Sequence, residues 1–286
     1  MTRSWSVLDA LSVPDRTDVD DFLARIARAH GEALTADQRA RLAGPAQVRH
    51  VLRRQASGSL SGYALLVDGP VIDAEAAFGT YDADLAKTLE GLGKPVALWV
   101  REVTDDQDAV LASRGWRRTR SLLLLGRPLP APSPDATVLD VRSFRPGIDD
   151  EEWIAENNAA FATHPTQGSM TLGRLRAIMR EPWFDPEGFL LFFDGGDLVA
   201  SCWTKIFRRE DVDEGEIFVI SVAPSGQGRG LGRLAVLSGL DHLARRGVGD
   251  AELYVEDSNA GAIRLYASLG FTFRSRDAEY RFDPAR

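Results

Sequence analysis

The sequence predicts an α/β (α+β) protein made of two tandem domains of similar fold, each with a mixed, mainly antiparallel sheet flanked by helices. Two observations predict this class. Residues 216–246 have the pattern of a strand, a glycine-rich turn and an amphipathic helix. The second half of the chain also repeats part of the first half, so one architecture is expected twice.

The composition is that of an ordinary globular protein. With 286 residues, 44% of them apolar, the chain is long enough for about two domains. Its net charge of −8 does not favour nucleic acid as a partner. The apolar runs, such as 122–125, are too short to cross a bilayer, so we expect no membrane partner and a cytoplasmic monomer. The single cysteine, Cys202, lies in an apolar run, and the four histidines are scattered, so we expect no metal.

The internal repeat has a constant offset. Leu98-Trp-Val100 aligns with Leu253-Tyr-Val255, and 112–116 aligns with 267–271, both at a distance of 155 residues (253 − 98 and 267 − 112). Between the copies, 127–134 holds four prolines, which stiffen an extended connection. We therefore expect domains at 1–130 and 138–286.

Each half has its own expected elements. In the first half we expect helical pieces within 13–57, strands at 63–67, 71–78, 96–100 and 121–125, and a helix at 105–114. In the second half we expect helices at 153–161 and 172–180, a hairpin of 189–193 and 198–207 closed by 194–197, a strand at 217–222, a helix from about 230, a strand at 251–256 and a helix at 257–270.

The glycine-rich turn predicts an anion site. The first amides of a helix lack intrahelical partners, and Gly228, Gly230 and Gly232 would let a pyrophosphate approach the backbone. No Gly-Lys-Ser/Thr follows, and the spacing is not that of a dinucleotide site. The run Val222–Gly232, Val-x-Pro-x-x-Gln-Gly-x-Gly-x-Gly, resembles the acyl-CoA signature of the GNAT N-acetyltransferases.

The first half lacks this turn. Only Gly79 remains of the glycines, and the carboxylates of Asp82 and Asp84 would repel an anion. We expect this half to be a structural or substrate-shaping copy.

Further motifs are Asn157-Asn-Ala-Ala-Phe161, His164-Pro-Thr-Gln-Gly168, Trp203-Thr-Lys205, Gly215-Glu216 and 253–259. Together they resemble the mycothiol synthase family of tandem GNAT enzymes. The resemblance implies transfer of acetyl from acetyl-CoA to the cysteinyl amine of desacetylmycothiol, the last step of mycothiol biosynthesis. It also implies that the N-terminal copy is the catalytically degenerate one.

The resemblance assigns roles to residues. Glu216 would be the base and would contact the amine, and Tyr266 would be the acid that protonates the thiolate; Leu111 replaces Tyr266 in the first copy. Lys205 and Tyr254 would contact the sugar conjugate. The residues expected to bind acetyl-CoA are Ile220, Ser221, Val222, Gln227, Gly228, Arg229, Gly230, Leu231, Gly232, Arg233, Asn259, Ala260, Gly261, Ala262, Ile263 and Arg264.

Two departures from the family pattern leave the acceptor open. Thr166 stands where the family has an acidic residue, and a glutamate expected near Ala46 is missing. One alternative is a GNAT N-acetyltransferase for another amine, such as an aminoglycoside, an amino acid or a peptide N-terminus. A second alternative, a non-catalytic acyl-CoA sensor, would need neither Glu216 nor Tyr266.

Overall fold

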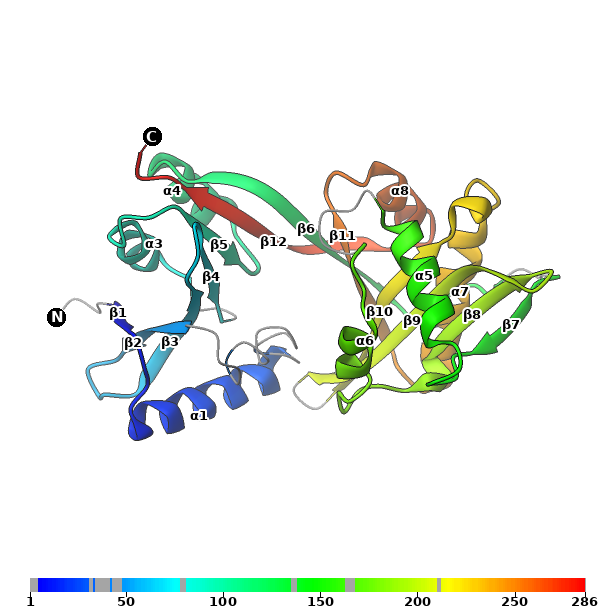
Figure 1. The fold of residues 1–286 in the computed structure, drawn as a ribbon, viewed down its shortest axis with the longest axis horizontal. Helices are drawn as coiled ribbons and strands as arrows, with labels where there is room; N and C mark the ends of the chain where they lie inside the picture. Colours follow the sequence, from blue (N-terminus) through cyan, green and yellow to red (C-terminus); the bar gives the residue numbers. More distant parts are fainter. Residues whose placement is uncertain are drawn as a thin grey trace. The chain divides into compact units, whose positions relative to one another are not determined.

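The computed structural model describes residues 5–30, 33, 42, 48–77, 81–134, 138–162, 168–209 and 212–285. The chain packs into two compact units (Figure 1). The first comprises Met1–Leu124, Glu256–Ser258 and Arg274–Arg286, and the second comprises Leu125–Val255 and Asn259–Phe273. The units are interleaved in sequence, and the linear division at 130–138 stays a prediction. Within the described ranges, no helix is long and apolar enough to cross a membrane.

The first unit contains a sheet in the order β1-β2-β3-β4-β5-β12-β6. Its strands are β1 (Trp5–Leu8), β2 (Val48–Arg54), β3 (Leu60–Val67), β4 (Ile72–Ala76), β5 (Val96–Val100), β12 (Thr272–Phe282) and β6 (Arg117–Pro128). β1 to β4 pair antiparallel, as do β5 and β12, while β4 and β5 run parallel. The expectation of helical pieces up to residue 57 is wrong for 48–54, because pairing with β1 and β3 on both sides holds this segment as a strand.

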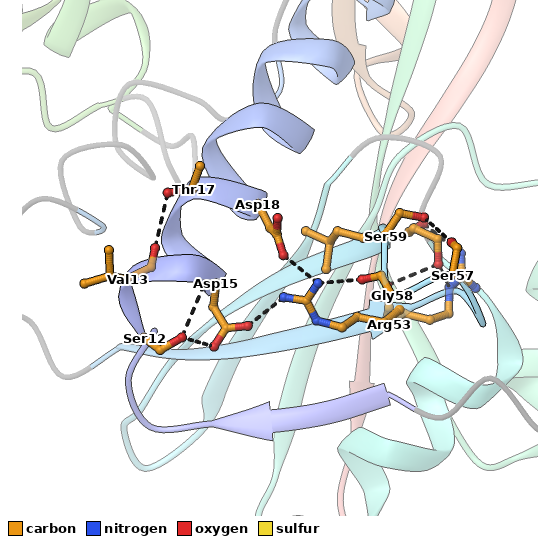
Figure 2. Close-up of polar contacts among 12 residues, drawn as sticks. Ser12, Val13, Asp15, Thr17, Asp18, Arg53, Ser57, Gly58 and Ser59 are labelled. Carbon is orange, nitrogen blue, oxygen red and sulfur yellow. Dashed lines mark hydrogen bonds and ion pairs between the residues drawn. The ribbon is translucent and has the colours of Figure 1, made fainter.

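In the described residues, this sheet is accompanied by the helices α1 (Val13–His30), α3 (Ala83–Glu90) and α4 (Asp105–Ser113). The Ser12 hydroxyl accepts a hydrogen bond from the Asp15 amide at 3.3 Å, which caps the start of α1. Arg54 on β2 donates to Asp15 and Asp18 of α1 and to the Gly58 carbonyl, so the first turns of the helix are tied to the β2–β3 turn. Figure 2 shows the three acceptors, Asp15, Asp18 and Gly58.

The second unit contains a sheet in the order β6-β11-β10-β9-β8-β7. Its further strands are β7 (Asp140–Ser143), β8 (Phe189–Asp194), β9 (Asp197–Arg209), β10 (Val212–Val222) and β11 (Asp250–Glu256). The hairpin of β8 and β9 is confirmed, with Gly195 and Gly196 at φ 60° and 98° in the turn. β10 and β11 run parallel, and the pairs from β7 to β10 are antiparallel.

The helices of the second unit are α5 (Asp150–Ala160), α6 (Leu172–Ile178), α7 (Leu231–Arg245) and α8 (Ala260–Ser268), with single 3₁₀ turns at Pro186–Gly188 and Pro224–Gly226. α5 and α7 cover opposite faces of the sheet (Figure 1). Ser201 of β9 bonds Trp153 of α5, whereas the next residue, Cys202, lies against Gly239 of α7. Stacked rings of Phe189 and Trp203, 4.4 Å apart, fill the core on the α5 side.

The repeat seen in the sequence is structural. Shifted by 155 residues, α4 (105–113) coincides with α8 (260–268). The glycine after each helix, Gly115 and Gly270, has a positive φ of 87° and 83°. The expected α/β fold with mixed, mainly antiparallel sheets is confirmed.

Candidate active site

The parallel strands β10 and β11 stay paired for only a short distance. β10 pairs with β9 from Val212 to Val222, but the described register with β11 comprises Gly215–Ala251 and Glu216–Glu252 alone. A bulge between Ile217 and Val219 adds local twist where the ladder with β11 ends. Within the described residues, the edge of β10 after Glu216 is therefore open toward β11, and an extended amide chain could add to it.

The glycine turn follows this open edge. Gly228 and Gly230 have φ of 75° and 78°, and Gly230 is the N-cap of α7 without any side-chain cap. Residues 227–230 and Arg233 are exposed, so the turn before α7 is accessible to solvent. Arg229 is paired with Asp194 at 2.6 Å. The geometry fits an anion site at a helix N-terminus.

The α8 helix carries the second predicted group of residues. Asn259 caps it by accepting a hydrogen bond from the Ala262 amide at 3.0 Å. Residues 259–261 and Arg264 are exposed, whereas Tyr266 is only 5% exposed. Burial raises the pKa of Tyr266, so the phenol is protonated near neutral pH and can act as a proton donor. No contact between Tyr266 and Glu216 is found in the described part of the chain.

Glu216 and Lys205 are brought together by the β9–β10 register. They are cross-strand partners, both buried, with Lys205 Nζ 3.3 Å from Glu216 Oε2. The rings of Trp183, Phe207 and Phe218 lie 5.3 to 5.8 Å from the ammonium. These rings limit the access of water to the pair, so the charge interaction is stronger than at a surface.

Further charged residues share this face of the sheet, and sequence reasoning missed them. Arg209 of β9 pairs with Glu214 of β10 at 2.6 Å and with Glu252 of β11 at 3.1 Å. Burial raises the pKa of Glu252, Arg209 lowers it, and the charge of Glu216 raises it. Two features of the sequence could have revealed these residues. Glu214 lies two positions before Glu216, and Glu252 lies two positions before Tyr254, so strand alternation puts each pair on one face of the sheet.

A buried polar chain on the α5 side was also missed. Trp153 Nε1 donates to Ser201 Oγ at 2.9 Å, Ser201 and Ser221 share a hydrogen bond of 2.7 Å, and Ser221 donates to Glu156 Oε2 at 2.6 Å. Glu156 Oε1 is buried without a hydrogen-bond partner among the described residues. Burial raises the pKa of Glu156 to about 7, and the Ser221 bond opposes this. The feature of the sequence that could have revealed this chain is the three-residue spacing of Trp153 and Glu156, which puts both on one helix face.

Some predicted positions cannot be placed. His164, Thr166 and Gln167 lie outside the described residues, as does the segment around Ala46. Tyr254 is half-buried on β11, on the strand that carries Glu252.

Comparison with known proteins agrees with this architecture. Residues 154–271 match the Acetyltransferase (GNAT) family. The mycothiol acetyltransferase of Streptomyces bingchenggensis is 38% identical to this chain, over 98% of the chain and 96% of that protein. The chain belongs to the mycothiol acetyltransferase family. A second mycothiol acetyltransferase, from Kineococcus radiotolerans, is 40% identical over 96% of this chain and 97% of its own length. A third, from Catenulispora acidiphila, is 44% identical over 66% of this chain and 62% of its own length.

Solved structures show the same fold. A GCN5-related N-acetyltransferase from Sphaerobacter thermophilus has a TM-score of 0.71 at 20% identity, covering 98% of this chain and 96% of that one. A tandem GNAT protein from the clavulanic acid biosynthesis pathway has a TM-score of 0.65 at 16% identity, covering 98% and 99%. The mycothiol acetyltransferase family and the tandem GNAT fold expected from the sequence are thus confirmed.

Proposed function

We propose that this protein transfers the acetyl group of acetyl-CoA to the cysteinyl amine of desacetylmycothiol, the last step of mycothiol biosynthesis. Membership of the mycothiol acetyltransferase family supports this. The observation that carries the proposal is the position of Glu216. It is a buried carboxylate at the last paired residue of the β10–β11 ladder, next to the open edge of β10.

Acetyl-CoA is proposed to bind along this edge and the turn that follows it. The backbone of Ile220–Val222 would pair with the pantetheine arm. Residues 227–233 would hold the pyrophosphate through the amides of 228–232, since those of Gln227 and Arg233 donate to Pro224 and Gly230. The start of α8, 259–264, would contact the coenzyme from the other side. The absence of a side-chain cap on α7 supports this assignment, because it leaves the amides available.

The reaction needs one base and one acid. Glu216 would take a proton from the acceptor ammonium, and the freed electron pair on nitrogen would form the N–C bond with the thioester carbon. As the C–S bond breaks, Tyr266 would donate its proton to the leaving thiolate, and it would regain one from the new amide nitrogen through solvent. A backbone amide of Ile220–Val222 would stabilise the oxyanion between these steps.

The acceptor is proposed to lie over the face that carries Lys205, Glu216 and Tyr254. Lys205 already holds Glu216 at 3.3 Å, so we propose that it orients the base as well as contacting the sugar conjugate. We further propose that residues 138–286 form the catalytic domain and 1–130 a degenerate copy. The enzyme is proposed to work as a cytoplasmic monomer without a metal.

Thiol release from acetyl-CoA by the purified chain tests this function. We expect turnover with desacetylmycothiol and little with simple amines or aminoglycosides. Turnover with other amines only would mean that another amine is the acceptor. An N-acetyltransferase for another amine is the second candidate, because Thr166 stands where the family has an acidic residue. Acetyl-CoA binding without thiol release for any acceptor would make the protein a sensor.

A further inference from the structure

Two buried carboxylates face each other across the parallel strands of the second unit. Glu216 on β10 and Glu252 on β11 are register partners, 8% and 2% exposed. Neighbouring strands lie about 4.8 Å apart, and register partners of a parallel pair point to the same face. Arg209 supports the shared face, because it contacts both Glu252 and Glu214. Glu214 lies two residues before Glu216 on β10, so both point to the same face of the sheet.

The charges around this pair nearly cancel. Lys205 contacts Glu216, and Arg209 contacts Glu214 and Glu252, so these five side chains carry three negative and two positive charges. Among the described residues, the charged groups that act on Glu252 include Arg209 from β9 and Glu216 and Glu214 from β10. On the other neighbouring strand, β6, Arg127 is turned away to the carbonyls of Leu269, Pro128 and Pro130. The cluster can therefore accept one proton without building up positive charge.

Lys205 alone would make Glu216 a poor base. An ammonium at 3.3 Å in a site lined by three aromatic rings favours the ionised carboxylate and so weakens its attraction for a proton. A general base works best when its affinity for protons is matched to the operating pH. A second carboxylate beside Glu216 opposes the effect of Lys205, because like charges favour protonation of one member of the pair.

We propose that Glu252 is a positioning residue for Glu216. The negative charge of Glu252 favours transfer of the proton of the acceptor ammonium to Glu216. This proposal rests on the proposed function only in naming the ammonium as proton donor. The proton leaves nitrogen for a Glu216 oxygen, and the nitrogen electron pair becomes available for the N–C bond. Glu252 touches neither substrate in this account and acts through its partner.

The coupling can be measured without any substrate. We would follow the side-chain carboxyl signals of ¹³C-labelled glutamate by NMR as a function of pH, in the wild type, Glu252→Gln and Glu214→Gln. Glu214 is the matched control, because it also contacts Arg209 but is not the register partner of Glu216. The Glu216 signal, assigned with Glu216→Gln, should titrate at a pH lower by on the order of one unit in Glu252→Gln. The shift in Glu214→Gln should be smaller.

The same variants are then compared in turnover with the acceptor that the wild type uses. The acid limb of the kcat/KM profile should move to lower pH in Glu252→Gln, and Glu252→Asp should restore part of the wild-type profile. An unchanged Glu216 titration in Glu252→Gln, or an equal shift in Glu214→Gln, would overturn the proposal. If the wild type fails to acetylate desacetylmycothiol, the proposed function fails, while the carboxyl titration still decides the coupling. Unfolding midpoints of the variants show whether a fold defect contributes.

Discussion

Each unit contains a parallel strand pair at the corresponding position, but in the described residues the pair of the second unit has a much shorter register. In the first unit, β4 and β5 are in register from Ile72–Val96 to Glu75–Trp99, nearly the whole of β4. In the second unit, the register of β10 with β11 covers two residue pairs, and β10 continues to Val222. A continuous ladder uses its own backbone groups, whereas a ladder that ends early leaves them to a ligand. The fold is shared, and the proposed difference in function follows from where the ladder stops.

The helices that follow these strands differ in whether a side chain already binds their N-terminal amides. The N-cap of α3 is Asp82, whose carboxylate accepts hydrogen bonds from the Leu85 amide and from Trp5 Nε1, both at 2.8 Å, and also contacts Arg53. The N-cap of α7 is Gly230, without a side-chain bond. The sequence predicts that Asp82 would repel an anion. The structure gives a more direct reason, because this carboxylate already occupies the helix N-terminus.

The 155-residue offset also relates the reactive positions. Val96 and Ala251 correspond, and their strand partners are Ile72 and Gly215, so the next residues along, Asp73 and Glu216, correspond as well. Asp73 is exposed and Glu216 is buried. The carboxylate of the first unit therefore lies in solvent, whereas the corresponding carboxylate of the second unit is enclosed by the protein.

The largest effect is expected at this pair of carboxylates. Glu216→Gln should slow turnover by roughly 10²–10⁴-fold, the usual contribution of a general base, and leave acetyl-CoA affinity nearly unchanged. Asp73→Asn should leave both values unchanged. Steady-state rates and equilibrium binding of the two variants check this, and equal losses in both would contradict the asymmetry of the units.

A smaller loss is expected for the proposed acid. Tyr266→Phe should slow turnover by roughly 10²-fold, the low end for general acid–base catalysis, because a thiolate is already a fair leaving group. The Phe271 ring, 5.8 Å away, should still support a phenyl ring at this position. Rates of wild type and variant at saturating acetyl-CoA measure the effect, and an unchanged rate would remove Tyr266 from the mechanism.

Glu156 predicts a pH dependence of stability in the second unit. Its pKa is raised from 4.5 to about 7 in the folded chain, so the folded state holds a proton that the unfolded state has lost between these values. Stability should fall as pH rises through this window, by up to roughly 3 kcal/mol.

Glu156→Gln removes this titration and should be more stable than the wild type at pH 8, with little difference at pH 4.5. Urea unfolding at both pH values checks this. Ser221→Ala is the control, because it removes the hydrogen bond to Glu156 and leaves the ionisable group in place. A gain of stability in Glu156→Gln that is the same at both pH values would contradict the assignment.

The cap of α3 can be transplanted to α7. Gly230→Asp should supply a carboxylate to the amides of α7 and weaken acetyl-CoA binding by roughly tenfold or more, since hydrogen bonds to a charged group contribute ~1.5–3 kcal/mol each. Gly230→Ala controls for strain at the positive φ of 78°. The Michaelis constant for acetyl-CoA should rise more in Gly230→Asp than in Gly230→Ala. Equal constants would show that the helix N-terminus does not hold the pyrophosphate.

The smallest effect is expected for the reverse change in the first unit. Asp82→Ala removes an N-cap and should destabilise the chain by ~1 kcal/mol without changing turnover. Asp84→Ala is the matched control, because Asp84 lies in the first turn of α3 but does not cap it. Thermal unfolding of the two variants measures the difference, and a change in turnover with Asp82→Ala would give the first unit a catalytic role.

Local patterns in the sequence predicted much of this structure. The β8–β9 hairpin, the helix that begins after Gly230 and the coincidence of α4 with α8 follow from turn residues, glycines and a fixed repeat offset. The strand β2 was missed, because its conformation depends on pairing with β1 and β3 and not on its own residues.

The part of the candidate site that was missed consists of contacts between distant segments. Arg209 reaches Glu252 across 43 residues of sequence, and Ser221 reaches Glu156 across 65. A single sequence does not reveal either contact, because the two contacts depend on the register of three strands and on the packing of α5 against the sheet. The residues that resemble a known motif were found, and those that set their charge environment were not.

The stoichiometry of acetyl-CoA binding tests most directly the claim that one unit alone has an open site. Isothermal titration of the wild type should give one equivalent per chain, lost or strongly weakened in Gly230→Asp and kept in Asp82→Ala. Two equivalents in the wild type, or binding that survives Gly230→Asp and disappears in Asp82→Ala, would contradict the account.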